Sequence, residues 1–357
     1  MLRLEFKSYL LDFKFPAGTS RGVMHQRKVW FLKLSKSSQP EVSGFGEAAP
    51  IHRLSLEDID KVEAVLKDIK RKLSRLQMPF NRAEAYDLVR DLVPEPFASV
   101  KFGLEMAFLD LLSGGNKEVF DSELSKGQGS IPINGLIWMN NLNHMKEQVE
   151  QKIQEGFTCI KLKIGALDFE KELTLIEFLR NLAGDAVIRV DANGAFQARE
   201  ALAKIKRLAA FNIHSIEQPI MPSQMEAMQL LCNKAAIPIA LDEELIPVKS
   251  SEEKKEILDF LKPQFLVLKP TLLGGFVHVE EWIRLAEERN IQWWITSALE
   301  SNLGLNAISQ FAATYDNELP QGLGTGQLYH NNIESPLRIS EGKLFYDPKK
   351  SWAKIPV

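Results

Sequence analysis

Two lysines stand in the otherwise apolar stretch CIKLKIG at residues 159–165. Side chains of a β-strand alternate between its two faces, so Lys161 and Lys163 would point the same way. Burying an ammonium group without a partner costs free energy, which makes a lysine pair in such a strand unusual. The stretch therefore indicates a functional site at which two ammonium groups converge.

Ionisable residues end five apolar stretches in succession along the second half of the chain. They are Lys163, Asp191, Glu217, Asp242 and Lys269, spaced 28, 26, 25 and 27 residues apart. Each spacing is the length of one strand followed by one helix. The carboxyl ends of the strands in a parallel barrel form one rim, and that rim carries the active site. The regular spacing therefore predicts that all five side chains meet at one mouth.

Three of these five residues are carboxylates, and side by side they would repel one another and raise each other's pKa. A hard cation among them would remove that conflict. Asp191, Glu217 and Asp242 offer oxygen ligands only, which favours Mg²⁺, or Mn²⁺, over Zn²⁺. The two lysines that flank them in the chain, Lys163 and Lys269, would face each other across the mouth.

A divalent cation beside a lysine suits the removal of a proton next to a carboxylate group. The resulting enediolate dianion is unstable in water, and a cation at its oxygens stabilises the charge where it develops. The five residues therefore predict a metal-dependent enzyme that acts on a small carboxylate substrate.

The elements that must position these residues change character near residue 130. Residues 1–128 read as mixed α+β, with alternating strand patterns at 2–15 and 27–34 and helical periodicity at 56–76 and 98–115. Eight short apolar stretches then alternate with helical ones, at 131–137, 158–164, 186–192, 213–219, 237–243, 265–270, 291–297 and 319–325. Strict alternation predicts an α/β fold with a closed (β/α)₈ barrel. An open doubly wound sheet would usually carry a glycine fingerprint, which KIGALDF at 163–169 lacks.

Composition narrows the class of protein further. The 357 residues are 45% apolar and 25% charged, and the net charge of -3 argues against a nucleic-acid partner held by bulk charge. Neither Cys159 nor Cys232 has the spacing of a metal ligand or a disulfide framework, which predicts a reducing, cytoplasmic location. With no signal-peptide pattern and no run of about 18 apolar residues, we expect no membrane partner. The sequence leaves the oligomeric state open.

Five short motifs, together with one near the N-terminus, resemble those of the enolase superfamily. They are KLKIG (161–165), VDANGAF (190–196), IEQP (216–219), LDEEL (241–245) and LKPTLLGG (268–275), with GFGEAAP (44–50) similar to the capping-domain motif. The stretch ITSALES (295–301) has no histidine, which excludes the mandelate-racemase-like pattern and indicates the muconate-lactonising-like subgroup. The resemblance implies an N-terminal α+β capping domain (1–128), a modified barrel (129–325) and a C-terminal segment (326–357) that returns to the capping domain.

The resemblance also assigns roles to the residues at the predicted mouth. It implies that Asp191, Glu217 and Asp242 bind Mg²⁺. It further implies that Lys163 is the base, with Lys161 as its helper, and that Lys269 faces it from the opposite wall. A lysine base combined with Mg²⁺ is the arrangement used across that superfamily.

Within the superfamily, two stretches resemble the o-succinylbenzoate synthases. They are INGLIWMN (133–140) and GLGTGQLYHNNIESPL (322–337). These enzymes form an aromatic ring in menaquinone biosynthesis by dehydrating 2-succinyl-6-hydroxy-2,4-cyclohexadiene-1-carboxylate. If the resemblance extends to function, Lys163 removes the α-proton and Lys269 stays cationic and stabilises the intermediate.

Two alternatives remain open at this point. In a dipeptide epimerase or N-acylamino-acid racemase both lysines move a proton. Dipeptide epimerases usually carry an acidic pair after the eighth strand, and GLGTGQLY (322–329) has none, which favours the synthase. A non-catalytic metal-binding barrel is the more remote alternative, since such proteins typically lose a base or a ligand and none is missing here.

Residues around the strand ends are candidates for substrate contacts or for orienting the main groups. Asn193 follows Asp191 by two and would share its face. The full set is Asn193, Glu243, Ser297, Glu300, Gly324, Thr325 and, from a loop of the N-terminal domain, Arg21.

Overall fold

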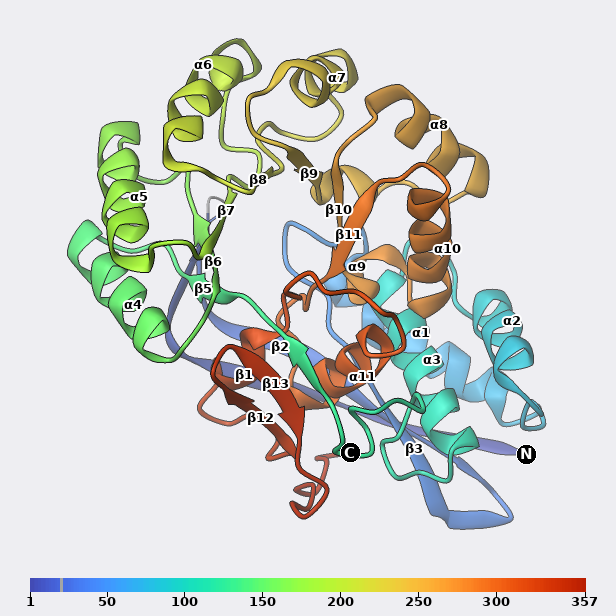
Figure 1. The fold of residues 1–357 in the computed structure, drawn as a ribbon. Helices are drawn as coiled ribbons and strands as arrows, with labels where there is room; N and C mark the ends of the chain where they lie inside the picture. The colour runs from blue at the N-terminus through green and yellow to red at the C-terminus, as the bar shows by residue number, and fades with distance from the viewer. Residues whose placement is uncertain (20–21) are drawn as a thin grey trace.

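The computed structural model describes residues 1–19 and 22–357, and the predicted contact residue Arg21 lies outside the described residues. The architecture has two parts. An antiparallel sheet with helices forms the N-terminal part, and a curled parallel sheet surrounded by helices forms a modified (β/α)₈ barrel (Figure 1). This confirms the fold class that the alternating pattern predicted.

The N-terminal part is built on three antiparallel strands in the order β1-β2-β3. Its elements are β1 (Leu2–Thr19), β2 (Gly22–Lys36), β3 (Gln39–Ala48), the 3-10 helix η1 (Ile59–Lys61), α1 (Val62–Leu73), α2 (Arg82–Leu92) and α3 (Ala98–Leu112). Alternate residues of β2, Trp30, Leu32 and Leu34, face a core shared with the apolar stripe of α1. Helix α1 begins later than the periodicity predicted, because the 3-10 helix η1 comes first, capped by the Asp58 side chain, which accepts from the Asp60 amide (3.1 Å).

The parallel sheet has seven strands in the order β11-β10-β9-β8-β7-β6-β5. They are β5 (Gly135–Ile137), β6 (Cys159–Lys163), β7 (Val187–Asp191), β8 (Ser215–Glu217), β9 (Ile239–Leu241), β10 (Phe265–Leu268) and β11 (Gln292–Ile295). The connecting helices are α4 (Leu142–Gln154), α5 (Phe169–Ala183), α6 (Ala198–Leu208), η2 (Ala209–Phe211), α7 (Met225–Lys234), η3 (Glu243–Leu245), α8 (Ser251–Leu261), α9 (Pro270–Leu273), α10 (Phe276–Glu287) and α11 (Asn302–Ala312). Sequential strands pair in parallel, because each helix returns the chain to the same edge of the sheet.

The eighth strand predicted at 319–325 is not formed, and the barrel closes through two single bridges instead. Gln321 bridges to Ile133 ahead of β5, and Gly322 bridges to Thr296 after β11. Pro320 has no amide hydrogen to donate, and glycine weakens a strand, so this stretch cannot sustain a longer ladder. The 3-10 helix η4 (Gly324–Gln327) follows at once.

Helix α3 joins the two parts and is almost completely buried. Its Gly103 lies against Gly46 of β3, where a Cβ on Gly46 would come within 1.9 Å of the Gly103 carbonyl oxygen. Only glycine allows such a close approach of a helix to a sheet. On the barrel side, Glu105 accepts a hydrogen bond from the Phe276 amide at the start of α10 (2.5 Å). Helix α3 therefore links the N-terminal sheet directly to the barrel.

The C-terminal residues contact both parts. Strands β12 (Leu337–Ser340) and β13 (Lys343–Tyr346) form a small sheet with β4 (Ser130–Pro132), just ahead of the barrel. Before them, Tyr329 bridges to Phe13 of β1, and the Lys14 amide donates to the Leu328 carbonyl (2.9 Å). The boundaries 1–128, 129–325 and 326–357 stay a prediction, which the contacts with β1 support.

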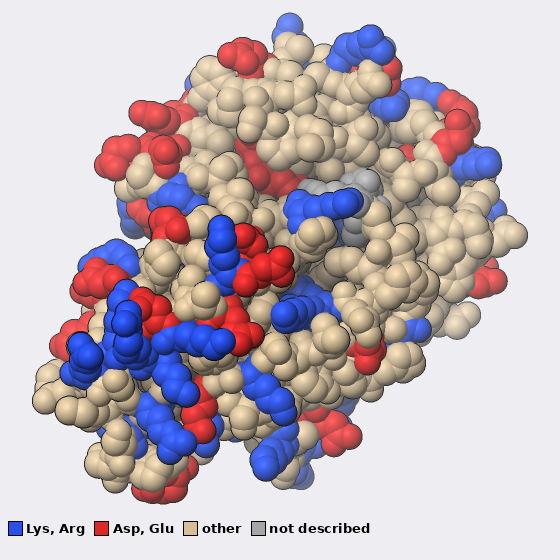
Figure 2. Space-filling view, turned by 180° about the vertical axis from the view of Figure 1, so that it is seen from behind, with Lys and Arg blue, Asp and Glu red and all other residues tan. Residues whose placement is uncertain are grey.

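The surface mixes charges of both signs. On α1, Lys67 pairs with Glu63 (2.8 Å), and Asp68 pairs with Lys72 (2.9 Å). Figure 2 shows Lys and Arg side chains interspersed with Asp and Glu on the face opposite that of Figure 1. None of the helices in the described part of the chain is long and apolar enough to cross a membrane.

The buried Glu105 gives the packing of α3 on the barrel a pH dependence. Burial raises the pKa of Glu105 from 4.5 to about 8, against the hydrogen bond from Phe276. Between these values the folded state holds a proton that the unfolded chain releases, so stability falls as pH rises through this window. Glu105→Gln cannot titrate, and we expect its free energy of unfolding to fall less than that of the wild type between pH 5 and pH 8. Urea unfolding at several pH values measures the two slopes.

The exposed Glu63→Gln is the matched control and should keep the wild-type slope, because Glu63 lies on the surface of α1. Equal slopes for Glu105→Gln and the wild type would contradict the prediction.

Candidate active site

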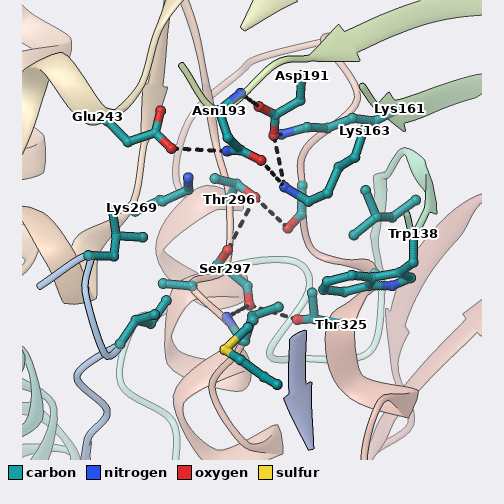
Figure 3. Close-up of a pocket in the computed structure, with 18 of the residues that line it drawn as sticks. Trp138, Lys161, Lys163, Asp191, Asn193, Glu243, Lys269, Thr296, Ser297 and Thr325 are labelled. Carbon is teal, nitrogen blue, oxygen red and sulfur yellow. Dashed lines mark hydrogen bonds and ion pairs between the residues drawn. The ribbon is translucent and has the colours of Figure 1, made fainter. Parts of the chain in front are cut away.

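The ionisable strand ends lie together at the carboxyl-terminal side of the parallel sheet. Lys163 on β6 is paired in register with Asp191 on β7, which is paired with Glu217 on β8. Asp242 directly follows β9, and Lys269 directly follows β10. Because neighbouring parallel strands end at the same level, the structure brings all five side chains to one mouth, with Lys163 and Lys269 on opposite sides of it (Figure 3).

Each carboxylate of the predicted metal set is paired with a lysine. The Lys161 ammonium group lies 2.5 Å from Glu217 and 2.9 Å from Asp191. Lys269 pairs with Asp242 in the same way. The carboxylate side chains are only 1% to 3% exposed, so their charges must be compensated within the protein. Lysines from the neighbouring strands supply that compensation.

Lys163 is held by a short chain of polar side chains. Its ammonium group donates to the Asn193 side-chain oxygen (2.7 Å) and to Asp191 (3.1 Å). The Asn193 amide nitrogen in turn donates to Glu243 (2.9 Å), as the dashed lines in Figure 3 show. Asn193 has a positive φ of 44°, which turns its side chain back toward Lys163. The chain of contacts fixes the direction in which Lys163 points.

Burial and ion pairing act on the pKa values of these groups in opposite directions. Burial and then the neighbouring Asp191 raise the pKa of Glu217 to about 8, against the effect of Lys161. Burial also acts to raise the pKa of Asp191, but Lys161 and Lys163 outweigh it and hold the pKa well below its usual range. For Lys161 and Lys269 burial acts to lower the pKa, and the surrounding carboxylates outweigh it and raise the pKa. Both lysines therefore remain ammonium ions at neutral pH.

Within residues 1–19 and 22–357, no group of three or more His, Cys, Asp or Glu side chains already has the arrangement of a metal site. Ammonium groups lie against the carboxylate oxygens instead. The donor set nevertheless fits a hard divalent cation, because Asp191, Glu217 and Asp242 supply only oxygen from three adjacent strands. The buried Glu217 Oε1 accepts no hydrogen bond, and the Lys269 ammonium group is 3.9 Å from it. These observations support the predicted magnesium site.

A cavity of about 410 Å³ opens above these residues. Its charged side is lined by Lys161, Lys163, Asp191, Asn193, Glu243 and Lys269, whereas Glu217 and Asp242 are not among the lining residues. Its apolar side is lined by Val23, Met24, Ile51, Leu54, Leu136, Trp138, Ala298 and Leu299. A charged end and an apolar wall together suit a small carboxylate with a hydrocarbon ring.

The other predicted contact residues divide into two groups. Ser297, Gly324 and Thr325 line the cavity, and the Ser297 and Thr325 hydroxyl groups lie 2.7 Å apart. Glu300 does not line it. Its side chain is fully buried and accepts a hydrogen bond from the Ala298 amide (2.8 Å), so it lies behind the wall and does not face the substrate.

Sequence reasoning missed several residues that line the cavity. From the barrel these are Asn134, Leu136, Trp138 and Thr296, and from the N-terminal part they are residues 51–54. Residues 22–24 also line the cavity, and they belong to the stretch of the N-terminal domain from which a substrate contact was predicted. The barrel residues lie inside the quoted motifs INGLIWMN and ITSALES, so each motif pointed to the right place without its individual contacts. Residues 51–54 follow the motif GFGEAAP directly, and this adjacency was the available signal.

Comparison with known proteins identifies the family. The model of the Enolase C-terminal domain-like family matches residues 144–349, more than half of the chain. The chain belongs to the enolase superfamily. This confirms the resemblance seen in the strand-end motifs.

Three relatives describe its place within that superfamily. An o-succinylbenzoate synthase from Desulfotalea psychrophila is 44% identical over 96% of this chain and 98% of its own length. The crystal structure of MenC from the same species has a TM-score of 0.86 at 40% identity, over 96% of this chain and 99% of that one. The substrate-liganded L-Ala-D/L-Glu epimerase from Bacillus subtilis has a TM-score of 0.84 over 96% of this chain and 95% of its own, but at 21% identity it shows the fold alone.

The charge balance in the mouth predicts a metal-dependent stability. Lys161→Met leaves Asp191 and Glu217 without their shared partner, and we expect the metal-free variant to lose roughly 3 kcal/mol of unfolding free energy. A bound divalent cation would compensate the same carboxylates, so 10 mM Mg²⁺ should narrow the deficit. Chemical unfolding with and without Mg²⁺ measures both values.

Lys67→Met on α1 is the matched control and should show little change, since Lys67 is an exposed side chain whose ion pair with Glu63 lies on the surface. A deficit of equal size with and without Mg²⁺ would argue against a cation at these carboxylates.

Proposed function

We propose that this chain is an o-succinylbenzoate synthase. It removes water from 2-succinyl-6-hydroxy-2,4-cyclohexadiene-1-carboxylate to give 2-succinylbenzoate, a step of menaquinone biosynthesis. The observation that carries the proposal is the 44% identity to an o-succinylbenzoate synthase over 96% of this chain. The site suits this chemistry, because two lysines face one another across a cavity above three buried carboxylates.

Lys163 is the base in this proposal. As the neutral amine it takes the proton from the ring carbon that carries the carboxylate, and the electron pair of that bond moves into the carboxylate as an enediolate. The enediolate expels the hydroxyl group of the neighbouring ring carbon, and the Lys163 ammonium group protonates it to give water. The ring is then aromatic and Lys163 is again an amine. Because one lysine handles both transfers, the proton and the hydroxyl group leave from the same face.

Lys269 acts as a fixed positive charge on the opposite wall. The carboxylates around it keep its pKa raised despite burial, so it remains an ammonium ion. An ammonium group at this place stabilises negative charge as it develops on the substrate. Lys161 pairs with both Glu217 and Asp191 and adds a second fixed positive charge to the site.

Asp191, Glu217 and Asp242 would hold the divalent cation, which is Mg²⁺ in this proposal. When bound, the cation supplies Lewis-acid stabilisation of negative charge on the substrate carboxylate. In this proposal the hydroxyl groups of Ser297 and Thr325, which line the cavity, bind the succinyl arm of the substrate. We also propose that the protein is located in the cytoplasm.

The epimerase and racemase alternatives have weaker support. The epimerases and racemases are more distant relatives of this chain, for example an L-Ala-D/L-Glu epimerase at 23% identity, against 44% for the synthase. The stretch after the closing bridges, GLGTGQLY, offers no acidic pair for a substrate ammonium group. A non-catalytic barrel is disfavoured because Lys163 and Lys269 both line the cavity.

The first prediction of this proposal concerns the base. The wild-type protein with Mg²⁺ should convert the cyclohexadiene substrate to the aromatic product, followed by its ultraviolet absorbance. Lys163→Ala should lower kcat by roughly 10²–10⁴-fold, because proton transfer loses its base. The exposed Lys206→Ala on α6 serves as the control and should retain wild-type activity. A Lys163→Ala variant with full activity would remove Lys163 from the mechanism.

The second prediction separates the synthase from a two-base racemase. Arginine keeps a positive charge but cannot exchange its proton at neutral pH. We therefore expect Lys269→Arg to retain dehydration within about tenfold of the wild type, whereas Lys269→Met should lose about 10²-fold or more. Steady-state assays of both variants measure this. Equal inactivity of Lys269→Arg and Lys269→Met would instead indicate that Lys269 moves a proton.

A further inference from the structure

Arg27 on β2 makes two hydrogen bonds that join different parts of the molecule. Its guanidinium group is buried, with 5% of the residue exposed. One terminal nitrogen, Nη1, donates to the Ala298 carbonyl oxygen in the loop after β11, and the other, Nη2, donates to the Ala49 carbonyl oxygen after β3. One side chain therefore bridges the barrel and the N-terminal part.

The two segments that Arg27 bridges lie side by side in the apolar wall of the cavity, where Ile51 and Leu54 pack against the cluster that contains Ala298. On the barrel side, Ala298 itself and Leu299 line the cavity. On the N-terminal side, the lining residues 51–54 begin two positions after Ala49. Arg27 is not among the residues that line the cavity, so it acts behind the wall. The relative position of these two segments of the wall therefore depends on a contact that lies outside the cavity.

The barrel wall at 297–301 has no regular secondary structure of its own. Leu299 holds a left-handed φ of 65°, and its carbonyl accepts from the Tyr329 hydroxyl (2.7 Å). The Ala298 amide donates to Glu300 (2.8 Å), and the Ser301 amide donates to Glu47 of β3 (2.9 Å). Side-chain contacts from Glu300 and from other segments therefore determine the shape of this wall, and Arg27 supplies the contact to the Ala298 carbonyl.

We propose that Arg27 is a positioning residue that sets the shape of the apolar wall of the substrate cavity by holding the segment at Ala298 and the segment after Ala49 together. The inference deepens the proposed function and rests on it for its kinetic test. Arginine suits this role because its planar fork donates two hydrogen bonds in fixed directions, and a charged donor makes each of them stronger. A lysine at the same place carries the charge but cannot reach both carbonyls in that geometry.

The expected effect falls on binding more than on chemistry. Lys163 and Lys269 are positioned by strands β6 and β10, and Arg27 contacts neither. A wall that is no longer held would fit the substrate less closely in every state of the reaction. Such a loss of uniform binding raises KM and leaves kcat nearly unchanged.

The test compares Arg27→Lys and Arg27→Met with Glu105→Gln. Glu105 also joins the N-terminal part to the barrel, at the Phe276 amide, but it does not line the cavity or contact its walls. We expect both Arg27 variants to raise KM by about tenfold or more, with kcat within about threefold of the wild type. Glu105→Gln should leave KM unchanged. This result would separate the specific effect of Arg27 on the cavity wall from a general loosening of the contact between the N-terminal part and the barrel.

Amide hydrogen exchange provides a readout that does not depend on the substrate. Exchange at residues 49–55 and 297–301 should become faster in Arg27→Lys, and should stay at the wild-type rate in Glu105→Gln. An unchanged KM, a loss confined to kcat, or an equal rise of KM in Glu105→Gln would overturn the proposal. If the wild type does not turn over the substrate, the proposed function fails. The role of Arg27 would still be refuted if amide exchange at residues 49–55 and 297–301 were as slow in Arg27→Lys as in the wild type. If Arg27→Met does not fold, the comparison of Arg27→Lys with the wild type tests the role of Arg27 by itself.

Discussion

The need to balance charge inside the barrel mouth is the constraint on which the rest of the structure depends. Asp191, Glu217 and Asp242 are almost fully buried, and three carboxylates in such a place are unstable without positive charge. Lys161 and Lys269 supply part of it as ammonium ions whose pKa values the carboxylates raise. A divalent cation on the same oxygens would relieve the carboxylates and leave the lysines to face the substrate. The same electrostatics that make three buried carboxylates costly thus place positive charge where negative charge develops on a carboxylate substrate.

The fold serves this constraint by delivering one charged residue from each of five neighbouring strands. Regular strand–helix units place the strand ends at one level, so that Lys163, Asp191 and Glu217 are in register. The barrel alone leaves the mouth open on its apolar side. The N-terminal part covers that side with residues 22–24 and 51–54, and Arg27 ties this cover to the barrel loop at Ala298. The strand ends therefore carry the reactive groups, and the contact between the N-terminal part and the barrel determines how closely the substrate fits.

The site was predictable from the sequence to the extent that it follows a repeat. A constant spacing indicates which residues lie at the same rim, because strand–helix units of similar length end their strands at the same level of a parallel barrel. It does not describe loops whose shape comes from tertiary contacts. Glu300 was expected at the substrate, but the left-handed Leu299 turns the chain and Glu300 binds the Ala298 amide behind the wall. The pattern at 319–325 predicts a strand that closes the barrel, but Pro320 and the glycines after it permit only single bridges. The contacts of Arg27 join segments far apart in the chain, and no local pattern encodes them.

The most direct test of the central claim is a crystal structure with Mn²⁺, located by its anomalous scattering. We expect one ion in the mouth, bound by oxygen atoms of Asp191, Glu217 and Asp242, with the ammonium groups of Lys161 and Lys269 moved off those oxygens. A crystal soaked in millimolar Mn²⁺ that shows no ion at these carboxylates, with the lysine pairs unchanged, would contradict it.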